Sequence, residues 1–213
     1  MALASYFSDR IPGIEPCSQR VWKNCLAFEF ALVHMRGDER EAARHARLRT
    51  MVDSYFDTVW RSLRRLGVPS AAVDDGVQQV FLVAWRRMED IEPSLERSYL
   101  LGVALRVASE LRRSSRLRRE LPLEDSPDKG EQMRAVAPSP DEIYEQRRRV
   151  ALLASLLEEM PPKMREAFVL FELEELSAGE VARILQVPVG TVASRVRYAR
   201  AFINKRLTAR GAP

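Results

Sequence analysis

The side chains best suited to bind a ligand lie near the C-terminus, on one face of a predicted helix. Val192, Val196, Ala199 and Ile203 recur there at helical spacing, as residues that face a core do. The opposite face carries hydroxyl, phenol and guanidinium groups, from Thr191, Ser194, Arg195, Arg197, Tyr198 and Arg200. Arginine forks and hydroxyls hydrogen-bond to base edges and phosphates. The pattern therefore predicts a helix that reads duplex DNA, with an ordinary charged hairpin as the alternative.

The residues before this helix predict the element that positions it. Ser177 and Glu180 have the spacing of a capping box, which begins a helix. Pro188 and Gly190 then indicate a short turn into the second helix. No acidic residue follows Glu180, whereas seven basic residues do. We therefore expect a helix-turn-helix whose end attracts a polyanion.

A second set of candidate DNA ligands lies in the N-terminal half. Arg97, Ser98 and Tyr99 precede a helix whose predicted core positions include Leu100 and Val103. Its basic positions are Arg106, Arg112, Arg113, Arg116, Arg118 and Arg119. A basic helix beside an aromatic residue suits neutralisation of a DNA backbone and capture of an unstacked base. The alternative is that Tyr99 packs in the core.

The segment DDGVQQVFLVAWRR, residues 74–87, predicts a surface for a protein partner. Its core face follows helical spacing, through Val77, Val80, Phe81, Ala84, Trp85 and Met88. Its outward face carries Asp74, Asp75, Gln78, Gln79 and Arg86. Adjacent glutamines beside acids suggest polar docking, although most such faces are merely solvated.

The sequence predicts an all-α chain in which two small helical domains, joined by a flexible linker, carry these sites. The 213 residues are 46% hydrophobic, which is ample for packed cores. Apolar spacing predicts helices over 48–66, 71–88 and 94–119, and four helical segments within 143–210. We expect an N-terminal extension at 1–46, with one possible helix at 18–35, a first domain at 47–120, a linker at 121–142 and a second domain at 143–210. The linker is rich in proline and acid.

Other classes of protein fit the sequence poorly. It has no glycine-rich phosphate loop, nucleophile elbow or apolar pair of carboxylates, so we expect neither an enzyme nor a bound cofactor. Two cysteines predict a reducing cytoplasm rather than a disulfide framework. No run of about 18 apolar residues and no secretory signal are present, so we expect no membrane insertion.

Taken together, these segments resemble the ECF (extracytoplasmic function) sigma factors of bacterial RNA polymerase. DDGVQQVFLVAWRR resembles the family's polymerase-docking segment, and SYLLGVALRVASELRR its promoter-melting segment. MPPKMREAFVLFELEELSAGEVARILQVPVGTVASRVRYAR resembles its reader of the upstream promoter element. The resemblance covers roughly residues 47–120 and 143–208. It implies a transcription initiation factor that recognises promoters.

The resemblance implies roles for the candidate residues. Asp75, Gln78, Gln79 and Arg86 would dock on the clamp helices of core polymerase. The loop at 88–98 and the following helix would open the −10 element, through Arg97, Ser98, Tyr99, Arg106, Arg112, Arg113 and Arg116. Thr191, Ser194, Arg195, Arg197, Tyr198 and Arg200 would read the −35 element. The linker's reach of about 75 Å matches two turns of duplex, about 70 Å.

The sequence departs from the family at several positions. Gln79 stands where an acid is usual, and Gly76 where a bulky apolar residue is usual. Tyr99 replaces a tryptophan, and Ala193 and Tyr198 replace commonly basic residues. The promoter sequence therefore does not follow from the resemblance.

Two further expectations concern the extension and the rival function. Cys17, Cys25, His34 and His45 lie in the extension at a spacing that fits no compact zinc motif, so we expect no metal site, with a zinc-sensing extension as the alternative. A regulator such as an anti-sigma protein is the more natural partner of this extension. The rival function is a stand-alone helix-turn-helix regulator, which would need a dimer interface or a ligand pocket.

Overall fold

The computed structural model describes residues 39–120 and 140–209. The first range holds α3 (Glu39–Arg65), α4 (Ser70–Arg86), two 3₁₀ turns, η1 (Met88–Asp90) and η2 (Pro93–Leu95), and α5 (Glu96–Glu120). The second holds α6 (Pro140–Glu159), α7 (Pro162–Phe168), the π-helical turn η3 (Val169–Leu173), α8 (Ala178–Leu185) and α9 (Val189–Ala209). Neither range contains a strand, which confirms the all-α class.

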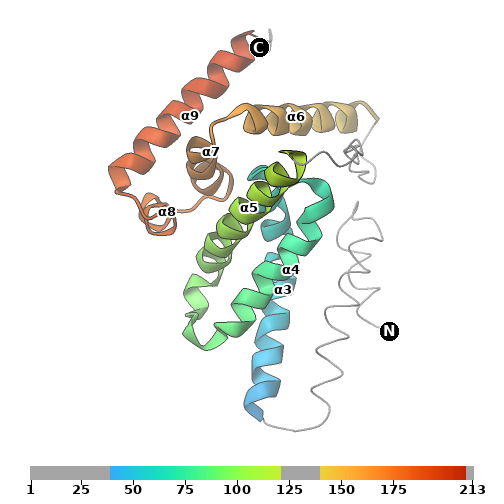
Figure 1. Ribbon diagram of the computed structural model, residues 1–213, viewed down its shortest axis with the longest axis vertical. Helices are drawn as coiled ribbons and strands as arrows, with labels where there is room; N and C mark the ends of the chain where they lie inside the picture. The colour runs from blue at the N-terminus through green and yellow to red at the C-terminus, as the bar shows by residue number, and fades with distance from the viewer. Residues whose placement is uncertain (1–38, 121–139, 210–213) are drawn as a thin grey trace.

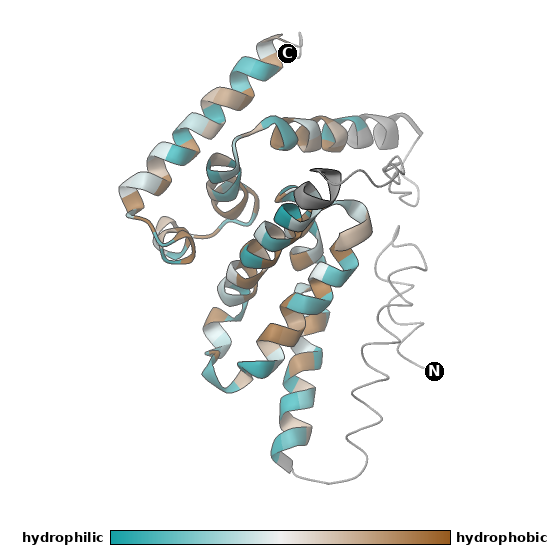
Figure 2. Ribbon diagram, viewed as in Figure 1, coloured by the Kyte–Doolittle hydropathy of each residue, from teal (hydrophilic) through white to brown (hydrophobic). Residues whose placement is uncertain are grey.

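The N-terminal half is a bundle in which α3, α4 and α5 pack on one another. Figure 2 shows hydrophobic residues alternating with hydrophilic ones along these helices. Of the predicted core face, Val77, Val80, Phe81 and Ala84 are buried in α4 and Met88 is buried in η1, while Trp85 is half-buried. At Gly76 a Cβ atom would lie 3.1 Å from side-chain carbons of both Leu63 and Leu111. The missing side chain therefore lets α4 lie close to both neighbours.

Helix α3 is longer than the sequence predicted, because it begins at Glu39 rather than near Leu48. Its added turns are held against the end of α4. Arg44 lies over the Trp85 ring at 4.6 Å and donates to the Trp85 carbonyl, and the His45 ring lies 4.6 Å from the same ring. The possible helix at 18–35 lies outside the described residues.

In the C-terminal half, α7 and α8 both pack on α9. The predicted breaks at Pro161-Pro162 and Leu176-Ser177 are confirmed, and a turn ends at Pro188, where α9 follows. Val192, Val196 and Ala199 are buried, as predicted for the inner face of that helix. No helix in the described part of the chain is long and apolar enough to cross a bilayer.

The two halves share their hydrophobic clusters. Leu101 of α5 is buried with Leu170 and Val181 of the C-terminal half. Met160 and Phe168, in turn, belong to the cluster of α3–α5. Figure 1 shows α5 (green) running between α3 and α4 on one side and α7 and α8 on the other. The predicted flexible linker at 121–142 lies mostly outside the described residues.

The turn after α7 contains a feature that the sequence did not predict. The backbone N–H of Glu174 donates to the Val169 carbonyl at 2.9 Å, which is the wider spacing of a π-helix. Glu175 then adopts φ of 52°, in the left-handed region. A side chain in that region costs roughly 1–2 kcal/mol.

We predict that Glu175→Gly stabilises the protein. Glycine adopts positive φ without steric cost, and it is the common residue at this position after a helix. The free energy of unfolding should rise by about 1 kcal/mol in urea denaturation. Glu175→Gln removes the same charge but keeps the strain, so it should leave the stability near that of the wild type. A gain in Glu175→Gln equal to that in Glu175→Gly would contradict this explanation.

Candidate nucleic-acid interface

Helix α9 presents the predicted DNA-reading face to solvent. Arg197 and Tyr198 are exposed, and Tyr198 keeps 57% of its surface accessible. The Arg197 guanidinium lies 5.1 Å from the centre of the Tyr198 ring, which places a cation and an aromatic face side by side. Thr191, Ser194 and Arg195 are half-buried at the start of the helix, nearer to α8. The chain therefore leaves a polar, basic face free for a partner.

The members of this face differ in their partners. Ser194 donates to the Thr191 carbonyl at 2.9 Å, so its hydroxyl is engaged within the helix. Arg200 forms an ion pair with Glu172 at 2.5 Å, where the side chain of Arg200 is 60% exposed. Within the described residues, neither Arg195 nor Arg197 pairs with a carboxylate. On this face, the exposed Arg197 and the half-buried Arg195 are thus the arginines without a carboxylate partner.

The predicted capping box begins α8 and is confirmed. The Ser177 hydroxyl donates to Glu180 at 2.6 Å and the Ser177 backbone N–H donates to the same carboxylate at 2.9 Å, while the Glu180 N–H donates to the hydroxyl. The hydroxyl bond, followed by the backbone bond, lowers the pKa of Glu180 below its ordinary value of 4.5. The box fixes where α8 begins, and α8 supports the start of α9.

In the N-terminal half, the predicted −10 residues begin α5. Ser98 donates to the Leu95 carbonyl at 3.1 Å. Tyr99 is half-buried and packs against the α3–α5 cluster, which is nearer to the alternative reading of this residue as a core position. Arg97 lies 3.8 Å from Glu174 of the C-terminal half. At this end of α5, all three predicted −10 residues therefore already contact other parts of the protein.

The remaining basic residues of α5 fall in different places. Arg106 and Arg113 are exposed. Arg112 is largely covered, because it pairs with Glu166 at 3.0 Å and donates to the Leu66 carbonyl. Arg116, Arg118 and Arg119 lie in α5, but their side chains are outside the described ones. The described structure therefore does not gather the predicted −10 residues on one free surface.

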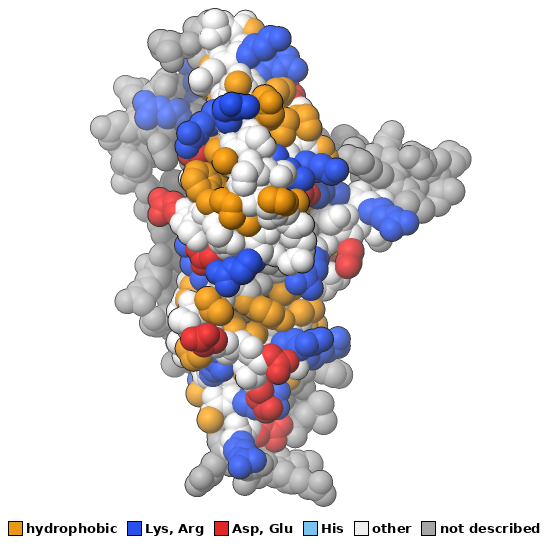
Figure 3. All heavy atoms as spheres, turned by 90° about the vertical axis from the view of Figure 1, so that its left-hand side faces the viewer, with side chains coloured by type: hydrophobic (Ala, Val, Ile, Leu, Met, Phe, Trp, Pro, Cys, Tyr) orange, Lys and Arg blue, Asp and Glu red, His pale blue; other side chains and the backbone are white. Residues whose placement is uncertain are grey.

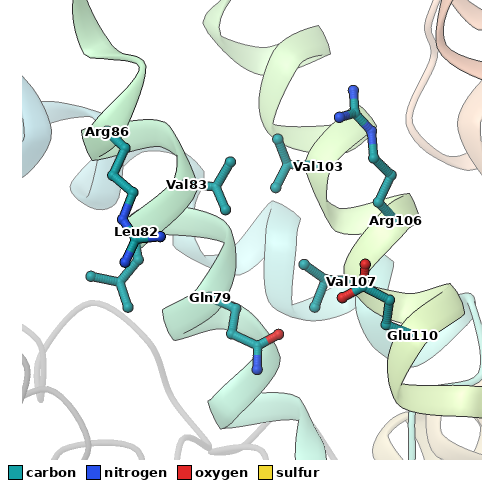
Figure 4. A pocket seen from close by; sticks show the side chains of 8 residues that line it. All are labelled: Gln79, Leu82, Val83, Arg86, Val103, Arg106, Val107 and Glu110. Carbon is teal, nitrogen blue, oxygen red and sulfur yellow. The ribbon is translucent and has the colours of Figure 1, made fainter. Parts of the chain in front are cut away.

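The predicted docking residues of α4 border a groove between α4 and α5. The groove has a volume of about 370 Å³, and Gln79 and Arg86 lie along it. Figure 4 shows Val83 and Val103 facing each other across it, with Arg106 and Glu110 on the α5 side. Asp75 is exposed and Gln78 half-buried on the same helix. An apolar floor with charged rims suits a helix of a partner protein.

Sequence reasoning missed the residues that join distant segments. Arg47 of α3 donates to the carbonyls of Met88 and Ile91 and pairs with Glu96 at 2.8 Å, so it holds the loop before α5. Glu174 is the buried partner of Arg65, at 2.8 Å. No local pattern marks these residues, because their partners lie 41 or more positions away.

Most of the side chains considered as metal ligands in the sequence lie outside the described residues. Of the four soft ligands of the extension, only His45 is described, and its ring packs on Trp85. Among the described residues there is no group of three or more side chains that could hold a metal ion.

Figure 3 views the face that carries α8 and α9 above α5. Basic side chains are prominent on its upper part, whereas acidic ones gather toward the lower end. A band of hydrophobic side chains crosses the middle of the same face. On this face the upper part is therefore the more basic one and is suited to a polyanion.

Comparison with known proteins gives matches in both halves. Residues 51–118 match the family Sigma-70 region 2, and residues 151–203 match the family Sigma-70, region 4. The chain is similar to the RNA polymerase sigma factor CnrH of Cupriavidus metallidurans, at 31% identity over 153 residues, which cover 70% of this chain and 80% of CnrH. It is also 30% identical to the ECF RNA polymerase sigma factor SigE of Mycolicibacterium smegmatis, over 70% of this chain and 57% of SigE.

A solved structure supports the same likeness. The structure of CnrH in complex with the cytosolic domain of CnrY aligns with a TM-score of 0.57 at 25% identity. The alignment covers 81% of this chain and 91% of that chain, so it includes both helical halves.

We predict that Ser177→Ala destabilises the protein by about 1 kcal/mol at neutral pH, since it removes an N-cap. The folded-state pKa of Glu180 is lowered, so the carboxylate's contribution is complete above its ordinary value of 4.5 and is lost as pH falls through the lower folded value. The deficit of Ser177→Ala should therefore shrink near pH ~3. Urea denaturation at both pH values measures it, with Ser109→Ala as the control. An undiminished deficit at low pH would refute the role of the carboxylate.

Proposed function

The chain belongs to the ECF sigma factors of bacterial RNA polymerase, and from that premise we propose how its surfaces bind core polymerase and the two promoter elements. Sigma factors recognise promoters and are not catalytic subunits. The single observation that carries the proposal is the outer face of α9, where Arg197 and Tyr198 are exposed and Arg195 is half-buried, while Val192 and Val196 are buried on the inner face.

We assign residues 143–210 to reading the −35 element as duplex. The capping box and the packing of α8 on α9 support a rigid helix that enters the major groove. Arg195 and Arg197 would donate to guanine or phosphate, while Thr191 and Ser194 would contact the backbone at the helix start. Tyr198 and Arg200 would extend the contact along the groove.

We assign residues 47–120 to polymerase docking and to the −10 element, with 121–142 as the connection between the domains. The groove between α4 and α5, together with Asp75 and Gln78, would receive a helical element of the polymerase clamp. At the other end of the domain, Arg97, Ser98 and Tyr99 would lie against the opened strand. Arg106, Arg112, Arg113 and Arg116 would neutralise its phosphates.

The cellular setting follows from this role. A protein that assembles with RNA polymerase acts in the cytoplasm. The related CnrH is solved in complex with the cytosolic domain of CnrY, and this supports a regulatory protein, such as an anti-sigma factor, as a further partner. The alternative of a stand-alone regulator is not favoured, because two sigma-factor segments occur in order along the chain.

We predict that Arg195→Ala weakens transcription initiation by about 10- to 100-fold, equivalent to the loss of one good base or phosphate contact. Reconstitution with core polymerase and selection of transcribed promoters from a genomic library would supply the template. Arg149→Ala, an exposed arginine of α6, removes the same charge and is the control. Initiation that survives Arg195→Ala unchanged would argue against α9 as the −35 reader.

We predict that Gln78→Ala lowers the affinity for core polymerase about fivefold or more, as expected of a residue near the centre of an interface. Fluorescence anisotropy of the labelled full chain with core polymerase measures this, without DNA. Asn204→Ala, which removes an exposed amide from α9, should bind core normally. Duplex binding without core, combined with no initiation in its presence, would instead support the stand-alone regulator.

A further inference from the structure

The short acidic segment between α7 and α8 lies against the N-terminal half. The Glu174 side chain is only 5% exposed and accepts from Arg65, at the end of α3, at 2.8 Å. Its other oxygen lies 3.8 Å from Arg97, at the start of α5. One carboxylate of the C-terminal half is therefore enclosed by two arginines of the other half.

A second carboxylate makes a similar contact at the other end of α5. Glu166 of α7 pairs with Arg112 at 3.0 Å, where the side chains are 19% and 14% exposed. Arg112 also donates to the Leu66 carbonyl, which accepts from Arg165 of α7 at 3.4 Å as well. The end of α3 is thus held by arginines from both halves.

Apolar contacts lie between these two ion-pair sites. Leu101 of α5 is 1% exposed, and it is buried by Leu170 and Val181 rather than by its own domain's cluster. The adjacent Gly102 faces Ile184, because a Cβ atom on it would lie 3.7 Å from that side chain. The halves therefore join through a packed contact surface, here called the seam, with charged pairs at its ends. Its apolar residues are Leu101, Gly102, Leu170, Val181 and Ile184.

The pairing has a consequence for DNA binding. Arg97 and Arg112 are two of the basic groups proposed above to neutralise the phosphates of the −10 region. A guanidinium fork binds a carboxylate or a phosphate with the same donors. While Glu166 pairs with Arg112, the Arg112 donors are not available to DNA. Arg97 lies 3.8 Å from Glu174 and keeps 40% of its side chain exposed, so there the carboxylate competes with a phosphate through its charge.

We propose that Glu166 and Glu174 form an acidic latch, which closes the free protein on itself and competes with promoter phosphates for Arg97 and Arg112. The closed form is the one described here, in which the halves share the seam at Leu101. Opening the latch releases both arginines, and promoter or polymerase must separate the halves to reach them. The competition with DNA rests on the proposed function, whereas the closure itself does not.

The closure is tested on the full chain by small-angle X-ray scattering. Glu174→Gln leaves Arg65 and Arg97 without their charged partner at a buried site, so the closed form should lose population. The radius of gyration should increase relative to the wild type. The charge swap Arg65→Glu with Glu174→Arg should return it toward the wild-type value, whereas Arg65→Glu alone should not.

The matched control is Glu172→Gln in the same segment. Glu172 pairs with Arg200 inside the C-terminal half, so this variant removes an equal charge without touching the seam, and it should stay compact. Glu166→Gln, at a less buried carboxylate, provides a second opening variant if Glu174→Gln fails to fold by circular dichroism. The latch would be overturned if the radius of gyration stayed at the wild-type value in a folded Glu174→Gln or Glu166→Gln variant. It would also be overturned if Glu172→Gln expanded as much as these variants.

The competition is tested by binding of the free chain to a single-stranded oligonucleotide. Glu174→Gln should bind about tenfold more tightly than Glu175→Gln, which removes an exposed carboxylate of the same segment, although both variants gain the same net charge. Expansion with no such gain would overturn the competition with DNA. It would also show that the −10 assignment of Arg97 and Arg112 fails, while closure stands. Loss of initiation by Arg195→Ala bears on the proposed function alone, so the two failures are distinguishable.

Discussion

The arrangement of the whole molecule depends on α5 being covered from two sides. Leu100, Val103 and Val107 are buried in the N-terminal bundle, while Leu101 is buried by residues of the C-terminal half. A helix that is apolar on two faces must bury both. The two domains are therefore packed together in this structure, because separating them would expose Leu101, a large apolar side chain, to water.

The same geometry decides which arginines are free. Arginines at the ends of the seam meet carboxylates, as Arg112 meets Glu166, whereas Arg106 and Arg113 on the outer side of α5 remain exposed. On α9 the division is similar, since Arg200 is paired with Glu172 while Arg195 and Arg197 are not. A count of basic residues along the chain thus overstates the number available to a polyanion at one time. Buried pairs of this kind cost desolvation, so removing one partner destabilises the protein by more than the intact pair stabilises it.

The strained turn before α8 links α9 to the seam. The π-helical hydrogen bond at Glu174 and the left-handed Glu175 lie immediately before the capping box that begins α8. Wider turns of this type are frequent at functional sites. Here the turn places Glu174 in the seam and precedes the start of α8, which packs on α9. The seam and α9 are therefore connected through one short segment.

Local patterns in the sequence determined the helical class, the order of elements and the inner faces of α4, α5 and α9. Helical spacing and capping act within a few residues, so Val80, Phe81, Val192 and the Ser177–Glu180 box were predictable and are confirmed. The exposed positions of Arg197 and Tyr198 follow from the same spacing. The tertiary structure alone decided the start of α3 at Glu39, the π-helical turn, and the pairing of Glu174 with Arg65 and of Glu166 with Arg112. The physical reason is separation: those partners lie 109 and 54 positions apart, and no pattern of period two or 3.6 connects residues at that distance.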